Sequence, residues 1–368
     1  MKRLLFFMHT GSPIGGVETW LDRACSYLSQ RGFDPVVGLV RGQQFNDPDR
    51  YRQFHPNLKT VEVDGSGLDR EGRVQALVRC IRSQRPDAVI PMGIVDANEA
   101  VIRCKLRGMP VRLVARAQGN LEPMLADLAD YRDWIDLAVC PGRLTQQVLV
   151  HWAQLPEQRV RHIPNGADRP ARRRTPRRPE TPLRIGYVGR LTNPDKRCLD
   201  LIDLQQQLHE RSVLCRIEVV GDGPGREELQ EACREGGPAV TFYGALPHQT
   251  IYEQIFPELD VLVLLSASEA FGIVLVEAMM HGVVPVSSRY VGFYAERLVQ
   301  DEQTGLSFPV GDMAAAAEAF GRLADHPGLL ERLSAQAEEH GSRYTWERSL
   351  SQWEDALLEV TEAPPVTG

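Results

Sequence analysis

Residues 261–280 read VLVLLSASEAFGIVLVEAMM, and this stretch decides the fold class of the chain. It opens with the apolar, β-branched run 261–265, which is typical of a buried parallel strand. It closes with the helical pattern 273–280. Glu269 is therefore predicted to lie on the loop between strand and helix, and Glu277 inside the helix.

This loop and helix carry groups that suit a phosphate and a polyhydroxylated ligand. The N–H groups at the helix start, near Gly272 and Ile273, have no partner within the helix and favour a phosphate. Glu269 lies beside that position and Glu277 lies further into the helix, so a ligand with hydroxyl groups at both ends would suit them. A nucleotide sugar is such a ligand, and carboxylates would accept strong, charge-assisted hydrogen bonds from its hydroxyls.

Apolar runs alternate with helical patterns over the whole chain. They predict strands at 4–8, 36–40, 60–63, 88–91, 112–115 and 137–140, and again at 183–188, 216–220, 240–242, 261–265 and 283–287. Between the two sets, residues 169–179 are rich in Pro and Arg and lack core residues, which predicts an exposed linker. We therefore expect an α/β protein with two Rossmann-like, doubly wound domains that face a cleft.

Composition excludes several classes of protein. A net charge of −7 over 368 residues argues against a nucleic-acid partner. Seven cysteines without C-x-x-C spacing indicate a reducing compartment and no zinc site. No run reaches the ~18 apolar residues of a membrane span, and the apolar start at 1–8 is too short for a signal peptide. We expect a cytoplasmic protein, and the arginines of 169–179 leave peripheral contact with anionic lipids open.

Beyond these patterns, the chain resembles the retaining glycosyltransferases of family 4, which have the GT-B fold. Glu269 and Glu277 match the E-x7-E motif of that family, and Arg190 with Lys196 resembles its phosphate-binding pair. The gap in this pair is one residue longer than usual, and Arg197 replaces a following glycine, so Arg197 could share the role. Further resemblances follow in the family's order at 14–18, 163–168, 219–224, 242–244 and 344–347.

The resemblance implies a metal-independent, retaining, hexosyltransferase-type enzyme (EC 2.4) without a cofactor. It would move a sugar from a nucleotide donor, most commonly a UDP-sugar, to an unidentified glycan, lipid-linked or small-molecule acceptor, as in polysaccharide biosynthesis, and release UDP. Residues 1–168 would form the acceptor-side domain and 181–345 the nucleotide-sugar-binding domain. A helix at about 346–362, with apolar residues every three or four positions, would cross back to the N-terminal domain.

Two alternatives to this enzyme and the oligomeric state remain open at this point. The alternatives are a non-catalytic sugar-nucleotide-binding subunit and a GT-B epimerase or phosphorylase.

By the same resemblance, Glu277 binds the ribose hydroxyls of the donor and Glu269 the hydroxyls of the donor sugar. Arg190 and Lys196 bind the diphosphate, and with Glu269 they are the catalytic candidates, because positive charge stabilises the departing phosphate. The complete set of expected donor-binding residues is Gly15, Gly16, Arg190, Lys196, Gly221, Glu269, Phe271, Gly272, Ile273 and Glu277.

The acceptor side departs from the family pattern. Many members carry a histidine at the end of an N-domain strand, whereas residues 114–120 read VARAQGN here. Arg116 and Gln118 are candidates for the polar contact at this place, and His9 is a further candidate because it follows the first strand. Residues 47–49 spell D-x-D, but their composition predicts a turn, and we expect no metal site.

Overall fold

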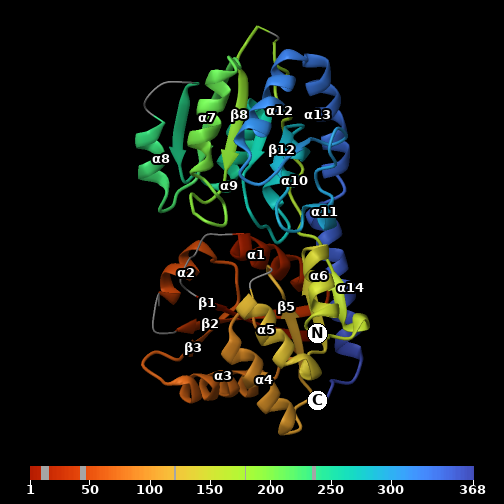
Figure 1. Ribbon diagram of the computed structural model, residues 1–368. Helices are drawn as coiled ribbons and strands as arrows, with labels where there is room; N and C mark the ends of the chain where they lie inside the picture. The colour runs from red at the N-terminus through yellow and green to blue at the C-terminus, as the bar shows by residue number, and fades with distance from the viewer. Residues whose placement is uncertain (10–15, 42–46, 120–121, 179, 234–237) are drawn as a thin grey trace. The chain divides into compact units, whose positions relative to one another are not determined.

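The structure is a computed structural model that describes residues 1–9, 16–41, 47–119, 122–178, 180–233 and 238–368, and it divides into two compact units (Figure 1). The first unit consists of Met1–Pro164 and Ser349–Gly368, and the second of Asn165–Arg348. The expected domains left residues 169–180 outside both, whereas this segment is part of the second unit.

The second unit is built on a parallel sheet with the strand order β10-β9-β8-β11-β12-β13. Its strands are β8 (Leu183–Val188), β9 (Cys215–Val220), β10 (Val240–Gly244), β11 (Val261–Leu264), β12 (Val284–Ser288) and β13 (Leu306–Phe308). Its helices are α7 (Asp200–Glu210), α8 (Arg226–Ala232), α9 (His248–Thr250), α10 (Ile273–Met280), α11 (Phe293–Glu296), α12 (Met313–Asp325) and α13 (Pro327–Gly341).

Strand β11 is buried on both faces. Val261 and Val263 belong to one hydrophobic cluster with α7 and α12, while Leu262 and Leu264 belong to another with α10. This double burial is why the strand is a continuous apolar run rather than an alternating one. The strand order reverses between β8 and β11, and the helices that follow these two strands, α7 and α10, pack on opposite faces of the sheet, which in such sheets leaves a ligand-binding crevice at the strand ends.

The first unit has the same architecture, with the strand order β3-β2-β1-β4-β5-β6-β7. Its strands are β1 (Lys2–His9), β2 (Phe33–Arg41), β3 (Thr60–Asp64), β4 (Ala88–Ile90), β5 (Arg112–Arg116), β6 (Leu137–Cys140) and β7 (Val160–His162). Its helices are α1 (Gly16–Ser29), α2 (Pro48–Phe54), α3 (Arg70–Gln84), α4 (Val95–Leu106), α5 (Glu122–Asp130) and α6 (Arg143–His151). Its order reverses between β1 and β4.

All the predicted strands are present, with small shifts at their ends, and both sheets are parallel as expected. Strands β7 and β13 were not predicted. Each has three residues, and β7 carries Arg161 and His162, so neither gives a long apolar run.

Helix α14 (Trp346–Glu362) also lies where the sequence predicts it, and from Ser349 onward the chain belongs to the first unit. Trp353 packs against Trp20 of α1, with ring centroids 4.9 Å apart. The predicted apolar stripe is buried as a whole and consists of Leu350, Trp353, Leu357 and Val360.

Most of residues 169–178 are exposed, as the sequence predicts, but Arg174 is an exception and is only 6% exposed. Its Nε donates to Ser334 Oγ at 2.9 Å, its Nη2 lies 2.6 Å from Glu331, and its backbone N–H donates to the carbonyl of His281 at 2.8 Å. Neighbouring arginines engage the second unit too: Arg172 with Glu258, Arg173 with Glu338, and Arg177 with the carbonyl of Ala324.

The loop after β9 fixes the loop after β8. Gly221 has a φ of +140°, and a Cβ there would lie 1.8 Å from the carbonyl oxygen of Gly189. This close approach lets the N–H of Leu191 donate to the carbonyl of Asp222 at 3.0 Å. Glycine at position 221 therefore sets the conformation of the segment that carries Arg190.

We expect Trp353→Ala to destabilise the first unit, because a large-to-small change in a core typically costs ~3–5 kcal/mol. Hydrogen exchange followed by mass spectrometry should show faster exchange in β1 while β11 of the second unit keeps its protection. Asp355→Ala, at an exposed position of the same helix, is the matched control. Unchanged exchange of β1 in Trp353→Ala would contradict the packing role of α14.

Gly221→Ala should lower the free energy of unfolding of the second unit by ~1–3 kcal/mol, since a Cβ clashes with Gly189 and the φ of +140° is strained for alanine. Urea unfolding measures this effect. Gly328→Ala is the control, because a Cβ at that glycine would meet no atom within 4 Å. Equal stability of the two variants would show that the two loops do not depend on each other.

Candidate functional site

A lysine and a carboxylate from the two loops at the strand reversal of the second unit form an ion pair. Nζ of Lys196 lies 2.6 Å from Oε1 of Glu269, and the same oxygen accepts a hydrogen bond from Ser266 Oγ at 2.6 Å. The N–H of Ala267 donates to the carbonyl of Asp195 at 2.9 Å and ties the loops together. The structure thus brings together two predicted site residues that are distant in sequence, and it adds Ser266.

Arg190 has a fixed backbone and an exposed side chain. The hydroxyl of Tyr187 donates to the carbonyl of Arg190 at 2.8 Å, which holds the main chain at the end of β8. The guanidinium lies 3.0 Å from Asp195, but the Arg190 side chain is 68% exposed. Exposed pairs contribute little stability, so this guanidinium is available to a ligand.

Asp195 organises the loop between the two cations. Burial alone would raise the pKa of Asp195, but hydrogen bonds from Thr192 Oγ1 (2.7 Å) and the N–H of Lys196, with the charges of Arg190 and Lys196, lower it. The carboxylate therefore stays ionised at neutral pH. Without a ligand, the cations Arg190 and Lys196 are balanced by the carboxylates Asp195 and Glu269.

Arg197, which could have shared the phosphate role, is engaged elsewhere. Its Nε lies 2.7 Å from Asp200, the first residue of α7. The structure therefore associates Lys196, and not Arg197, with Glu269.

Glu277 lies in α10, as predicted, and its Oε1 is 2.9 Å from Nε2 of His248. The His248 ring stacks on Tyr252, with centroids 4.4 Å apart. The sequence analysis did not select His248 as a candidate. No local pattern marks it, because 29 residues separate it from Glu277.

The start of α10 has no side-chain cap, and Gly272 adopts a left-handed φ of +82° there. Ile273 is the first residue of the helix and is half-buried. Phe271 is 3% exposed and packs against Tyr344, with centroids 5.6 Å apart. Its side chain is therefore part of the core, and any contact of Phe271 with a ligand would involve its backbone.

Of the site residues predicted near the N-terminus, the structure describes His9 and Gly16. His9 ends β1 and is exposed, while Gly16 begins α1 and is exposed. A Cβ at Gly16 would meet no atom of the described residues within 4 Å. Gly15 lies outside the described residues.

Arg116 and Gln118 both bury a donor that has no hydrogen-bond partner among the residues that the structure describes. These donors are Nη1 of Arg116 and Nε2 of Gln118. The Arg116 guanidinium stacks on Trp20, 4.1 Å from the ring centroid, and Trp20 was not predicted. Burial lowers the pKa of Arg116, and the charge of Glu18 opposes this effect. An unsatisfied buried donor is costly, which marks this end of β5 as a place for a ligand.

The D-x-D residues serve local structure. Oδ1 of Asp47 accepts from the N–H of Arg50 at 2.8 Å and caps α2, and Asp49 lies 2.8 Å from Arg52. Within the described residues, no group of three or more His, Cys, Asp or Glu side chains could hold a metal ion. No helix in the described part of the chain is long and apolar enough to cross a bilayer.

Comparisons with known proteins agree with this architecture. The chain is 31% identical over 198 residues to alpha-D-kanosaminyltransferase of Streptomyces kanamyceticus, covering 50% of each protein. It is 36% identical over 141 residues to 2-deoxystreptamine N-acetyl-D-glucosaminyltransferase of Streptomyces fradiae, covering 37% of this chain and 32% of that protein. The chain thus matches half or less of the length of these relatives.

Solved structures match over nearly the full length. Anabaena HepE in complex with UDP and glucose superimposes with a TM-score of 0.78 at 18% identity, covering 98% of this chain and 100% of HepE. The model of the family described as Glycosyltransferase Family 4 matches residues 14–169, and the model described as Glycosyl transferases group 1 matches residues 168–340. The two models follow each other along both units, and the chain therefore belongs to the family 4 glycosyltransferases of the GT-B fold.

Proposed function

We propose that the protein transfers a sugar from a nucleotide donor, a UDP-sugar, to a hydroxyl-bearing acceptor. The observation that carries this proposal is the contact between Lys196 and Glu269 beside Arg190, at the strand reversal of the second unit. The printed names of two relatives describe transfer of a sugar, and HepE was solved with UDP, which supports this choice of donor.

Donor binding would exchange ionic partners rather than create unpaired charge. In the free protein, the Lys196 ammonium compensates Glu269, whose side chain is 10% exposed. An incoming diphosphate attracts Lys196 and Arg190, and Glu269 then accepts hydrogen bonds from hydroxyls of the donor sugar. Each buried or half-buried charge keeps a partner throughout, which avoids the large cost of an uncompensated ion.

The second carboxylate would bind the other part of the donor. Glu277 lies about one helical turn beyond the loop that carries Glu269, and its Oε1 is already in contact with His248. We assign the ribose hydroxyls to Glu277. His248 orients this carboxylate and leaves its other oxygen for the nucleotide.

Transfer needs positive charge where the sugar–phosphate bond breaks. As that bond lengthens, negative charge grows on the departing diphosphate, and Arg190 and Lys196 stabilise it without a metal ion. The acceptor hydroxyl attacks the anomeric carbon from the face that the phosphate leaves, and a phosphate oxygen takes its proton. The anomeric configuration is thereby retained, and Glu269 holds the donor sugar in position during the step.

UDP should bind to chelator-treated protein as tightly as to protein with Mg²⁺, because Lys196 and Arg190 neutralise the diphosphate. Lys196→Met should weaken UDP binding by roughly a hundredfold, as expected for a lost charged hydrogen bond of ~2–3 kcal/mol. Uridine is the matched control ligand, since it lacks the diphosphate and should bind both proteins equally. Calorimetric titration measures each of these affinities, and UDP binding that needs a divalent metal would contradict the prediction.

Glu277→Gln and Glu269→Gln should have different effects. Glu277→Gln should lower UDP affinity by roughly tenfold or more because the ribose loses an ionised acceptor. Glu269→Gln should keep the UDP affinity of the wild type and lose sugar transfer, because this residue contacts the donor sugar. Equal UDP affinity in wild type and Glu277→Gln would overturn the assignment. Glu253→Gln, an exposed glutamate of the second unit, is the control and should change neither quantity.

A further inference from the structure

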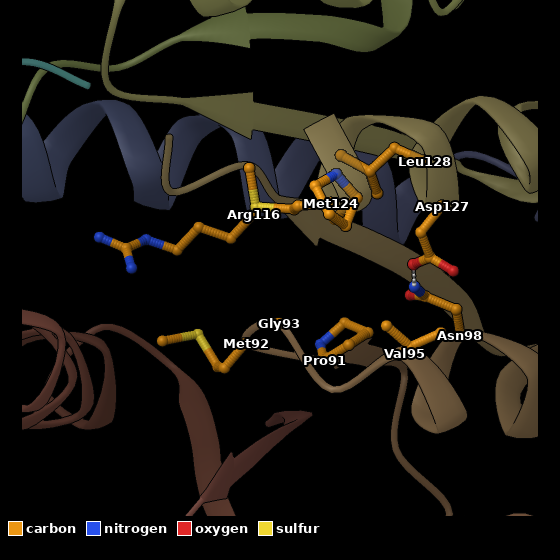
Figure 2. A pocket seen from close by; sticks show the side chains of 11 residues that line it. Pro91, Met92, Gly93, Val95, Asn98, Arg116, Met124, Asp127 and Leu128 are labelled. Carbon is orange, nitrogen blue, oxygen red and sulfur yellow. Dashed lines mark hydrogen bonds between the residues drawn. The ribbon is translucent and has the colours of Figure 1, made fainter. Parts of the chain in front are cut away.

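A cavity of about 360 Å³ lies in the first unit, where β4 and β5 end and helices α4 and α5 begin (Figure 2). Its volume is near the lower end of the ~300–1,000 Å³ that is typical of small-molecule sites. Most of its wall is apolar and is formed by Pro91, Met92, Val95, Ala115, Met124 and Leu128. A cavity of this size and lining fits one compact ring rather than an extended chain.

The backbone along one wall is strained. Met92 has a φ of +48° and Gly93 a φ of +84°. Methionine rarely adopts a left-handed conformation, and such residues cluster where proteins hold ligands. This strain is independent of the chemistry of the side chains that line the cavity.

One end of the cavity carries a carboxylate held by an amide. Nδ2 of Asn98 donates to Oδ2 of Asp127 at 2.6 Å, shown as a dashed line in Figure 2, and Asn98 is 5% exposed. Within the described residues, Oδ1 of Asp127 accepts no hydrogen bond. Burial raises the pKa of Asp127 to about 6, and the hydrogen bond from Asn98 and the charge of Arg70 offset part of this effect. A ligand that donates to Oδ1 would stabilise the ionised form.

Arg116 lies at the other end, and its guanidinium points away from Asp127 in Figure 2. The side chain of Arg116 is more than nine-tenths buried, and its Nη1 has no hydrogen-bond partner in the described part of the chain. Trp20 holds the guanidinium from one side by stacking, so the group cannot easily turn to solvent. An oxygen of a bound ligand would supply the missing acceptor.

The balance of charge narrows the class of ligand. Glu18 already opposes the charge of Arg116 electrostatically, and Asp127 contributes a negative charge at the other end. This arrangement does not call for a strongly anionic group such as a phosphate. It favours a neutral or cationic ring that has hydrogen-bond donors at one end and an acceptor oxygen at the other.

We propose that this cavity is the acceptor subsite, and that it takes one hydroxylated ring whose hydroxyl or amino group donates to Asp127 while an oxygen opposite accepts from Arg116. That the bound ring acts as acceptor rests on the proposed sugar transfer. That the cavity binds such a ring does not depend on that function. The apolar wall then covers the C–H face of the ring, and the two polar ends fix its orientation.

Ligand-observed NMR on the full chain tests this proposal with D-glucose and D-glucosamine as probes, and D-glucose 6-phosphate as the anionic comparison. D-glucose and D-glucosamine should both bind the wild type, and D-glucose 6-phosphate should bind no better than D-glucose.

Met124→Trp fills the cavity and should lower the affinity for both sugars at least tenfold. Asp127→Asn keeps the shape and should weaken D-glucosamine by roughly tenfold. If Asp127→Asn loses less affinity for D-glucose than for D-glucosamine, the group that contacts Asp127 is an ammonium. If it loses affinity for both sugars equally, that group is a hydroxyl.

Glu122→Gln is the control, because Glu122 is an exposed carboxylate of the same helix that does not line the cavity. UDP titration of each variant monitors the second unit separately. Sugar binding that persists in Met124→Trp, or no binding of either sugar to the wild type, overturns the acceptor subsite. If the wild type binds the sugars but does not bind UDP, the proposed function is overturned instead.

Discussion

Burial of both faces of a parallel sheet is the constraint on which the rest of this structure depends. Strand β11 meets this constraint with four apolar residues that point alternately into two cores. Helices must then cover both faces, and every crossover returns the chain to the same edge of the sheet. The loops that follow β8 and β11 therefore meet at one edge, and this convergence places Lys196 beside Glu269 although neither loop has regular structure.

The sequence predicts those elements that bury long apolar runs. The helix at 273–280 and the strand at 183–188 have in the structure the bounds that the sequence predicts, because their patterns end sharply at polar or glycine residues. The short strands β7 and β13 were not predicted, since polar residues interrupt their apolar runs, whereas the equally short β4 is apolar throughout. Arg174 shows the opposite failure: the composition around it indicates an exposed linker, but it finds partners in two distant segments, α13 and the end of α10, and becomes buried.

At the candidate site, too, some features could be predicted from the sequence and others could not. The resemblance to family motifs selected Glu269, Glu277, Arg190 and Lys196 as candidates, and the structure brings Lys196 into contact with Glu269. The resemblance could not reveal that His248 contacts Glu277, or that Trp20 stacks on Arg116, because these pairs depend on how distant elements pack. The sequence also could not show that the side chain of Phe271 is buried in the core, so that only its backbone is left to contact a donor.

The first unit is made of two pieces of chain, Met1–Pro164 and Ser349–Gly368, whereas the second unit is continuous. During synthesis, a ribosome therefore completes the second unit before it delivers Trp353, which covers Trp20. Until then, the first unit lacks part of its core and exposes the indole that the last helix will bury. The nascent protein thus passes through a stage in which the later-made half is complete and the earlier-made half still needs protection from aggregation.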